Sequence, residues 1–249
     1  MKRTVLSVVI PVYNEKTDIA ELVGRVEASP VDKEIILVDD ASTDGTPEII
    51  EKEVVPKCRN VKFIRHERNG GKGRAIRTGL EYVTGDIVLI QDADLEYDPA
   101  EYPQLVQPIL EGRTGVVYGS RFMKTDKRIF IWRWFQNRFL GKKYEIRYLH
   151  HFLGIQALNV LANLLYGANI TDEATCYKVI KTDLLKDINL RCEGFEFCPE
   201  ITAKLRKKGH TILEIPITYH PRTRQQGKKL NWTHGFEAIW TLIKYRFVD

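Results

Sequence analysis

The stretch that decides the fold reads Ile87-Val88-Leu89-Ile90-Gln91-Asp92-Ala93-Asp94-Leu95-Glu96. Four apolar residues are followed at once by a run that carries three acidic side chains. A short apolar run of this kind predicts a strand that is buried on both faces of a parallel sheet. The acidic run would then lie at the carboxyl end of that strand, which is the edge where open α/β sheets bind ligands.

The same alternation of apolar runs and helical patterns extends through the first 120 residues. The predicted strands are Val5–Val12, Glu34–Asp39, Val61–His66, Asp86–Gln91 and Gly115–Gly119. The predicted helices between them are Asp18–Ala28, Pro47–Val55, Lys72–Val83 and Ala100–Leu110. Such an order is typical of successive βαβ units. The sequence therefore predicts an α/β fold with a mostly parallel central sheet flanked by helices.

After Phe122 the pattern changes to long aromatic and basic helical stretches. A strand at Cys176–Lys181, a helix at Pro199–Lys208, a strand at Thr211–Ile217 and an amphipathic helix at Trp232–Phe247 are predicted further on. No linker, repeat or low-complexity tract interrupts the chain. We therefore expect residues 1–249 to form a single domain with two functional halves, 1–122 and 123–249.

The composition is that of a globular protein. Hydrophobic residues make up 43% and charged residues 29% of the 249 residues, which argues against disordered, collagen-like and coiled-coil classes. The four cysteines show no CxxC spacing and the start of the chain shows no signal-peptide pattern, so a cytoplasmic location is expected. The longest apolar stretch, Leu153–Tyr166, is broken by polar residues, and no membrane-spanning helix is expected.

The acidic run is a candidate metal site. Alternate residues of an extended segment point the same way, so Asp92, Asp94 and Glu96 could converge on one cation. Hard divalent ions such as Mg²⁺ prefer these oxygen ligands and commonly share them with substrate phosphates. The alternative is an ordinary solvated acidic turn.

Three other predicted strand ends carry candidate binding residues. Tyr13 and Glu15 follow the first strand and suit stacking on a base and accepting its N–H groups. Asp39 ends the second strand and could accept donors from a base or ribose, although Asp, Ser and Gly also form plain turns there. Lys72 and the neighbouring backbone N–H groups of Asn69–Gly73 could face an anion at the start of a helix.

Two common nucleotide-binding motifs are missing. The chain has no GxxxxGK[ST] loop and no GxGxxG after the first strand, so kinase and nicotinamide-dehydrogenase interpretations lose their main support.

Taken together, these segments resemble glycosyltransferase family 2, whose catalytic domain has the nucleotide-sugar-binding GT-A fold. The similarity runs in order through VIPVYNE, VDDASTDGT, NGGKGRAIRTG, DADLEYDP, GSRF, TDEATCYK, EITAKLRKKG and HPRTRQQGKK. It covers nearly the whole chain, and it is greatest to the dolichyl-phosphate mannosyltransferase and polyprenyl-phosphate glycosyltransferase branch. The resemblance implies an inverting, metal-dependent transfer of a sugar from a nucleotide diphosphate sugar.

The resemblance also implies roles for individual residues. With Lys72, the nucleotide sugar would be held by Pro11, Tyr13, Glu15, Asp39, Asp92, Arg222, Lys228 and Lys229. Asp92, Asp94 and Glu96 would engage Mg²⁺ or Mn²⁺; many relatives have Gln where this chain has Glu96, which leaves the metal preference open. Asp94, Arg121 and Asp172 would be the catalytic residues. The loop Pro221–Leu230, with its glycine and cations, is expected to close over the phosphates.

The nature of the acceptor decides whether a base is required. A polyprenyl phosphate is already largely ionised near neutral pH and needs none. A sugar hydroxyl would need a carboxylate, and Asp172 lies where relatives that act on hydroxyls carry their base. Both interpretations stay open, with Asp172 as base in one and as an orienting group in the other.

A basic and aromatic segment favours a lipid acceptor. Residues 121–151 carry nine Lys or Arg against two acidic residues, in a chain of net charge +5. Within Arg128–Phe152, aromatic residues alternate with basic ones such as Arg133 and Arg138, which suits an anionic membrane surface. A packed surface helix is the alternative, and no motif supports nucleic-acid binding. The resemblance implies a peripheral protein at the cytoplasmic membrane face, with Arg121, Arg133 and Arg138 near the acceptor.

Two other functions have less support in the sequence. A sugar-phosphate nucleotidylyltransferase would need an early GxGxRxxPxT-like loop, which is missing. A catalytically silent nucleotide- or lipid-binding module would not need Asp92, Asp94 and Arg121, all of which are present.

Overall fold

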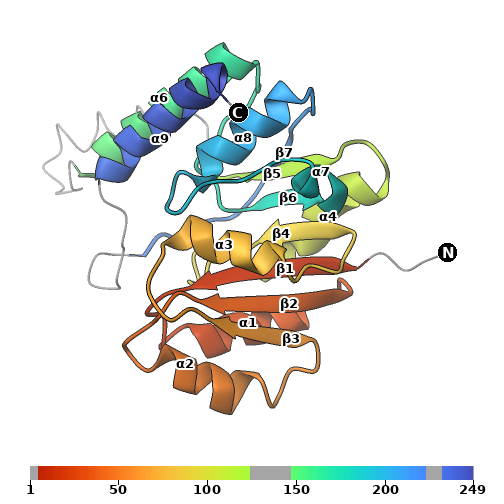
Figure 1. Ribbon diagram of the computed structural model, residues 1–249. Coiled ribbons are helices and arrows are strands. Elements are labelled where there is room, and N and C mark those ends of the chain that lie inside the picture. Colours follow the sequence, from red (N-terminus) through yellow and green to blue (C-terminus); the bar gives the residue numbers. More distant parts are fainter. Residues whose placement is uncertain (1–4, 124–146, 223–231, 249) are drawn as a thin grey trace, which may run out of the picture.

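The computed structural model (Figure 1) describes residues 5–123, 147–222 and 232–248. In these residues seven strands form one sheet in the order β3-β2-β1-β4-β6-β5-β7. The strands are β1 (Leu6–Val12), β2 (Lys33–Asp39), β3 (Val61–Arg65), β4 (Ile87–Ile90), β5 (Val116–Ser120), β6 (Lys178–Lys181) and β7 (Leu213–Pro216). Only β6 runs antiparallel to its neighbours. The predicted α/β fold with a mostly parallel sheet is confirmed.

Helices flank this sheet on both sides. They are α1 (Ile19–Ala28), α2 (Thr46–Ile49), α3 (Lys72–Leu80), α4 (Tyr102–Leu110), α6 (Arg147–Tyr166), α7 (Thr182–Lys186), α8 (Phe197–Lys207) and α9 (Trp232–Phe247). Two further turns of helix, the π-helical η1 (Ile50–Val54) and the 3₁₀ helix η2 (Pro99–Glu101), adjoin α2 and α4.

The position of the ligand site follows from the order of the strands. The chain builds β1, β2 and β3 outward in one direction and then returns to place β4 on the other side of β1. Since βαβ crossovers are right-handed, this reversal puts α3 on the opposite face from α1. The carboxyl ends of β1 and β4 thus flank a topological switch point, where open α/β sheets bind ligands.

Every residue of β1 and β4 is buried, which explains why these segments, apart from Ser7 in β1, are apolar. They belong to a core that extends through α1, α3, α4 and the antiparallel strand β6. This rigid layer fixes the loops at the carboxyl end of the sheet.

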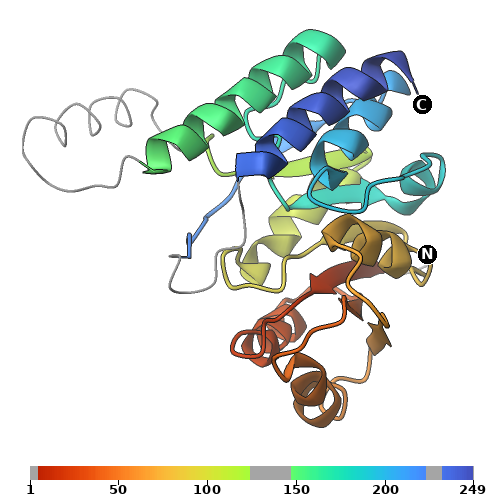
Figure 2. The same cartoon turned by 60° about the vertical axis from the view of Figure 1, so that its left-hand side comes forward.

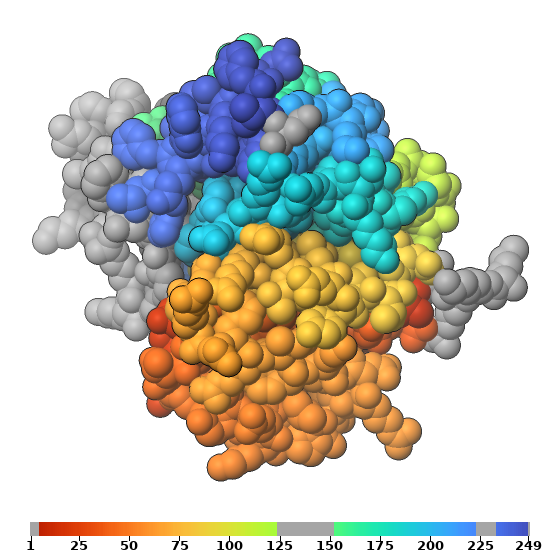
Figure 3. All heavy atoms as spheres, in the orientation of Figure 1, coloured from red at the N-terminus to blue at the C-terminus, as the bar shows by residue number. Residues whose placement is uncertain are grey.

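A second, smaller core joins three helices of the second half. α6 and α9 lie side by side in both views of the molecule (Figures 1 and 2), and both pack on α8. In Figure 3 this group lies at the opposite end of the molecule from α2 and η1. In the described ranges, no helix combines the length and the apolar composition that are needed to cross a bilayer.

Several boundaries differ from the sequence prediction. The helix expected at Pro47–Val55 begins at Thr46 and changes to π-helical hydrogen bonding at Ile50. The short helix α7 was not predicted, because five residues are too few to show a helical period. The end of the helix expected at Lys72–Val83 is three residues earlier, at Leu80.

Candidate active site

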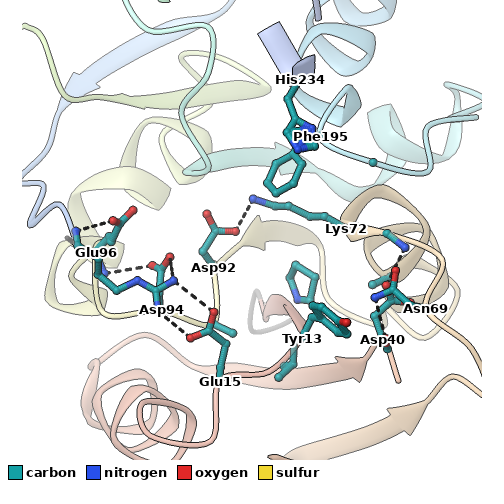
Figure 4. Close-up of a pocket in the computed structure, with 17 residues that line it drawn as sticks. Tyr13, Glu15, Asp40, Asn69, Lys72, Asp92, Asp94, Glu96, Phe195 and His234 are labelled. Atoms are coloured by element: carbon teal, nitrogen blue, oxygen red, sulfur yellow. Dashed lines mark hydrogen bonds and ion pairs between the residues drawn. The ribbon is translucent and has the colours of Figure 1, made fainter. Parts of the chain in front are cut away.

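A pocket of about 430 Å³ opens at the carboxyl end of the sheet (Figure 4). Eight of the predicted site residues line it: Pro11, Tyr13, Glu15, Lys72, Asp92, Asp94, Glu96 and Arg222. They come from segments more than 200 residues apart in the sequence. The structure therefore brings together the strand ends at which ligand binding was predicted.

The loops after β1 and β2 are tied to each other. Asn14 and Ala41 both have positive φ, at 51° and 60°, a conformation that non-glycine residues seldom adopt. The N–H of Asn14 donates to Ser42 Oγ at 2.8 Å, and Asn14 Oδ1 accepts from the N–H of Thr43 at 2.8 Å. These bonds hold Tyr13 at the mouth of the pocket, where 38% of the residue is exposed. An exposed ring beside a pocket can stack on a nucleobase.

The second strand presents Asp40 to the pocket, whereas Asp39 does not line it. Asp39 is fully buried; its Oδ2 accepts from the N–H of Ser42 at 3.1 Å, and its Oδ1 has no hydrogen-bond partner in the described residues. The proposed contact of Asp39 with the nucleotide stays a prediction, and Asp40 joins it as a pocket residue that the sequence did not single out.

Asp40 fixes the loop that precedes α3. Its carboxylate accepts the N–H groups of Gly70 at 2.9 Å and of Gly71 at 2.7 Å, and it contacts His66 Nδ1 at 2.7 Å. The N–H groups of Gly70 and Gly71 are therefore not available to a bound anion, because they donate to Asp40; for the rest of Asn69–Gly73 the expectation stays a prediction. Gly71 is required here: its φ is +89°, and a Cβ would lie 2.4 Å from the carbonyl oxygen of Glu193.

The three carboxylates of the acidic run face different partners (Figure 4). Asp92 pairs with Lys72, Asp94 Oδ2 lies 2.9 Å from Arg222 Nη2, and Glu96 Oε2 accepts the Tyr219 hydroxyl at 2.7 Å. The described residues contain no group of three acidic, His or Cys side chains arranged to hold a metal ion. Within the described residues, Asp92 and Asp94 are thus each paired with a cation of the protein itself, and Glu96 accepts hydrogen bonds.

Burial and charge give Asp92 and Asp94 different proton affinities. Burial, followed by the nearby charges of Asp92 and Glu96, raises the pKa of Asp94 to about 7, and Arg222 opposes this rise. Burial also acts to raise the pKa of Asp92, but the charge of Lys72, hydrogen bonds from Cys176 and Lys72, and the charge of Arg222 together lower the pKa of Asp92. Of these two carboxylates, Asp94 is thus the one that binds a proton more readily.

Arg222 ties the second half of the chain to this run. Its guanidinium binds Glu15 through two nitrogens at 2.8 and 3.2 Å, and its backbone N–H donates to Glu96 Oε1 at 2.6 Å. Together with the bond to Asp94, these contacts place one guanidinium between the end of β1 and the end of β4. Arg222 lines the pocket, and its predicted contact with a diphosphate stays a prediction.

Arg121 and Asp172 form a separate buried pair. Arg121 Nε and Nη2 each lie 2.7 Å from one oxygen of Asp172, and the N–H of Arg121 also donates to Asp172 at 3.0 Å. Glu214 accepts the N–H groups of Thr171 and Asp172, which fixes the backbone beneath the pair. Neither Arg121 nor Asp172 is among the residues that line the pocket.

Other predicted residues cannot be placed. Arg133, Arg138, Lys228 and Lys229 lie outside the described residues, as does the loop Pro221–Leu230 beyond Arg222. Their proposed roles at the acceptor, at the nucleotide and over the phosphates stay predictions.

Besides Asp40, sequence reasoning missed Gly194, Phe195 and His234 as lining residues. Gly194 and Phe195 come from the loop before α8. His234 reaches the pocket from the first turn of α9. No motif marks these positions, since they meet only when α3, α8 and α9 are packed together.

The charge of the pocket lining fits a divalent cation. Five carboxylates face two basic side chains, Lys72 and Arg222, among the described lining residues. A diphosphate would meet net repulsion in such a pocket unless a cation entered with it. Asp92 and Asp94 supply the hard oxygen donors that Mg²⁺ or Mn²⁺ prefers.

A mostly parallel sheet with an acidic run at the end of β4, at the switch point, is the arrangement expected of the GT-A fold. The sequence places the chain more narrowly: residues 7–188 match the family described as Glycosyl transferase family 2. The chain belongs to this family, as the motifs predicted.

Similar curated proteins include transferases that act on lipid phosphates. The chain is 31% identical over 247 residues to the low-salt glycan biosynthesis hexosyltransferase Agl6 of Haloferax volcanii, covering 98% of this chain and 53% of that protein. It is 29% identical to the dolichol-phosphate mannosyltransferase of Pyrococcus furiosus, covering 96% and 64%. It is 30% identical to a UDP-N-acetylglucosamine–dolichyl-phosphate N-acetylglucosaminyltransferase of Methanococcus voltae, covering 98% and 96%. The chain thus spans between half and two thirds of the first two relatives and nearly all of the third.

Solved structures confirm the fold. Glucosyl-3-phosphoglycerate synthase of Mycobacterium tuberculosis, in complex with Mn²⁺, UDP and phosphoglyceric acid, superposes with a TM-score of 0.70 at 17% identity, covering 100% of this chain and 80% of that one. The mannosyltransferase PcManGT of Pyrobaculum calidifontis, in complex with GDP-Man and Mn²⁺, gives a TM-score of 0.57 at 22% identity, covering 87% and 56%.

Proposed function

We propose that the protein transfers a hexose from a nucleotide diphosphate sugar, of the GDP-mannose or UDP-glucose type, to a polyprenyl or dolichyl phosphate, with inversion and with Mg²⁺ or Mn²⁺. The observation that carries the donor half of this proposal is the acidic pocket at the carboxyl ends of β1 and β4. Its five carboxylates would repel a diphosphate, so a divalent cation and the nucleotide should bind together.

Asp92 and Asp94 are the residues that would hold the metal. Glu96, whose two oxygens accept hydrogen bonds from Tyr219 and from the N–H of Arg222, is the third acidic residue of the run. When bound, the metal supplies a positive charge that stabilises the departing diphosphate. Arg222 adds a second positive charge on the same side, since its guanidinium already lies against Asp94 and Glu15.

The environment of Asp172 favours an acceptor that needs no base. Asp172 is fully buried, and both of its oxygens are bound by the guanidinium of Arg121. A carboxylate held in this way cannot readily remove a proton, but it can orient Arg121. The phosphate of a polyprenyl phosphate is already ionised and can attack the sugar directly. Relatives from Pyrococcus and Methanococcus are named for dolichol- or dolichyl-phosphate acceptors, which supports this choice.

The outer surface of α6 and α9 supports delivery of the acceptor at a lipid surface. Large apolar side chains are exposed there: Leu153, Val160, Leu164, Phe236, Trp240, Ile243 and Phe247. The inner faces of the same helices pack into the second core, so these residues form the opposite face of a two-helix layer. Exposed Lys244 and Arg246 in the last turn of α9 can pair with anionic headgroups. We place this face on the cytoplasmic membrane surface.

A substitution on this face tests the membrane contact. Trp240, which is 64% exposed, should lose membrane affinity when it is replaced by Glu, because burying a large apolar side chain in lipid contributes about 1.5–3 kcal/mol. Cosedimentation of Trp240→Glu with anionic liposomes should fall by about tenfold or more. The control is Val55→Glu, which alters an exposed apolar residue at the other end of the molecule. Equal binding by Trp240→Glu and the unmodified protein would contradict the assignment of this face.

The function itself is tested with purified protein and a panel of nucleotide sugars. UDP-glucose, UDP-N-acetylglucosamine and GDP-mannose are each offered with polyprenyl phosphate in liposomes, with Mn²⁺ or Mg²⁺ or with EDTA. We expect lipid-linked sugar with at least one donor and only when a metal is present. Product formation that is unchanged by EDTA would overturn the metal assignment.

A further inference from the structure

Two aromatic rings form the wall of the pocket on the side of the second half. Phe195 lies in the loop before α8, and His234 lies in the first turn of α9; their ring centroids are 4.6 Å apart at an interplanar angle of 54°. Figure 4 shows the two rings across the pocket from Tyr13 and Glu15. Lys72 Nζ lies 5.7 Å from the centre of the Phe195 ring, so Phe195 separates His234 from the Lys72–Asp92 pair.

The imidazole of His234 has hydrogen-bonding capacity that the described residues do not use. Its Nδ1 is buried and has no hydrogen-bond partner among them. The nearest carboxylate oxygen, Glu237 Oε2, is 3.6 Å away, which is too far for a hydrogen bond. A buried polar nitrogen without a partner costs free energy, and a ligand that supplies one is bound more tightly.

The charges around these rings favour a neutral ligand over a second anion. Both basic side chains among the described lining residues, Lys72 and Arg222, are already paired with carboxylates. Five carboxylates line the same pocket, so a phosphate placed against this wall would be repelled. A hexose suits it better, because its hydroxyls can bond to an imidazole and to an ion pair, while its C–H face can lie against an aromatic ring.

We infer that Phe195 and His234 form the subsite for the transferred hexose, in which His234 hydrogen-bonds a sugar hydroxyl and Phe195 packs against the sugar ring. The inference rests on the proposed function, since it places a sugar next to the nucleotide diphosphate. His234, in α9, would then help to determine which sugar the protein accepts. The nucleotide and the metal are held by other residues, at the ends of β1 and β4.

The test separates the sugar from the nucleotide. Binding of UDP-glucose, UDP-N-acetylglucosamine and GDP-mannose, and of UDP and GDP, is measured by calorimetry with Mn²⁺. His234→Ala should weaken the affinity for the nucleotide sugar by about 5- to 10-fold, which is the effect of one lost hydrogen bond to a buried group. It should change the affinity for the nucleoside diphosphate by less than about twofold. Phe195→Ala should act in the same direction. His234→Gln, which keeps a donor and an acceptor, should recover much of the loss, and thermal melting verifies the fold of each variant.

A histidine outside the pocket provides the control. His210→Ala removes a histidine that does not line the pocket and should leave both affinities unchanged. If His234→Ala lowers the affinity for UDP or GDP as much as that for the matching nucleotide sugar, or lowers neither affinity, the assignment of the sugar subsite is wrong. The proposed function then still stands. If the unmodified protein binds nucleoside diphosphates but none of the nucleotide sugars more tightly, the subsite is overturned for these sugars. If it binds no nucleotide at all, the proposed function fails as well.

Discussion

Replacing Asp94 by Asn should reduce sugar transfer by at least about 100-fold and leave the protein folded, because the variant keeps the size of the side chain and removes the charge that would bind the metal. Asp94 is a proposed metal ligand and pairs with Arg222, so both positive charges that would meet the diphosphate depend on it. The measurement is the steady-state rate with saturating donor and Mn²⁺. Asp187→Asn, at an exposed carboxylate paired with Lys208, is the matched control and should keep full activity.

The raised pKa of Asp94 adds a pH signature to this prediction. A carboxyl with a pKa of about 7 is largely protonated at pH 6 and largely ionised at pH 8, so Mn²⁺ affinity in the presence of nucleotide should rise over this range. Asp94→Asn should flatten that rise. The folded pKa lies above the unfolded one, so ionisation costs folding free energy as the pH rises towards 7. The variant should therefore melt at the same temperature as the unmodified protein, or higher, at pH 8. Full turnover by the variant would remove Asp94 from the metal site.

Replacing Arg121 by Met should destabilise the protein by about 3–5 kcal/mol, the usual cost of leaving one member of a buried ion pair without its partner. The side chain of Arg121 is 12% exposed and that of Asp172 is fully buried, so water cannot replace the lost guanidinium. Denaturant unfolding measures the loss. The same variant should also lose most activity if Arg121 faces the reacting phosphates.

A double substitution separates the two effects. Arg121→Met combined with Asp172→Asn removes the buried charge while keeping an oxygen that can accept the backbone N–H of residue 121. It should recover most of the stability and none of the activity. If the double variant also recovered transfer, Arg121 would serve only to neutralise Asp172 and would have no role at the phosphates.

The strand pattern and the end of β4 could be predicted because their causes are local. Strands buried on both faces are mainly apolar, and β4 and, apart from Ser7, β1 are. The acidic run directly follows such a strand, so its place at the carboxyl edge follows from chain direction alone. The sequence does not show which of the two aspartates at the end of β2 lines the pocket. Asp39 and Asp40 are adjacent and chemically identical, and only the packing of the loops decides that Asp40 lines it.

The partners of the acidic run were also beyond prediction from sequence. In an extended segment, alternate side chains point the same way, which predicted that Asp92, Asp94 and Glu96 share one side of the chain. The backbone bends after β4, however, and the three carboxylates face different partners, which are Lys72, Arg222 and Tyr219. Arg222 lies 128 residues from Asp94, and His234 reaches the pocket only through the packing of α9 on α8. Contacts between residues so far apart in the chain form only when the helices pack together. They produce no motif with a fixed spacing in the sequence.

Transfer to two acceptors tests the central claim most directly. The protein is given the donor that it binds, with Mn²⁺, and either polyprenyl phosphate in anionic liposomes or a soluble glycan that ends in a hydroxyl. The account predicts transfer to the lipid phosphate that EDTA abolishes and that Arg133→Glu with Arg138→Glu weakens without changing nucleotide affinity. Transfer only to the glycan, with loss of activity in Asp172→Asn, would contradict it and would make Asp172 the base of a hydroxyl-directed transferase.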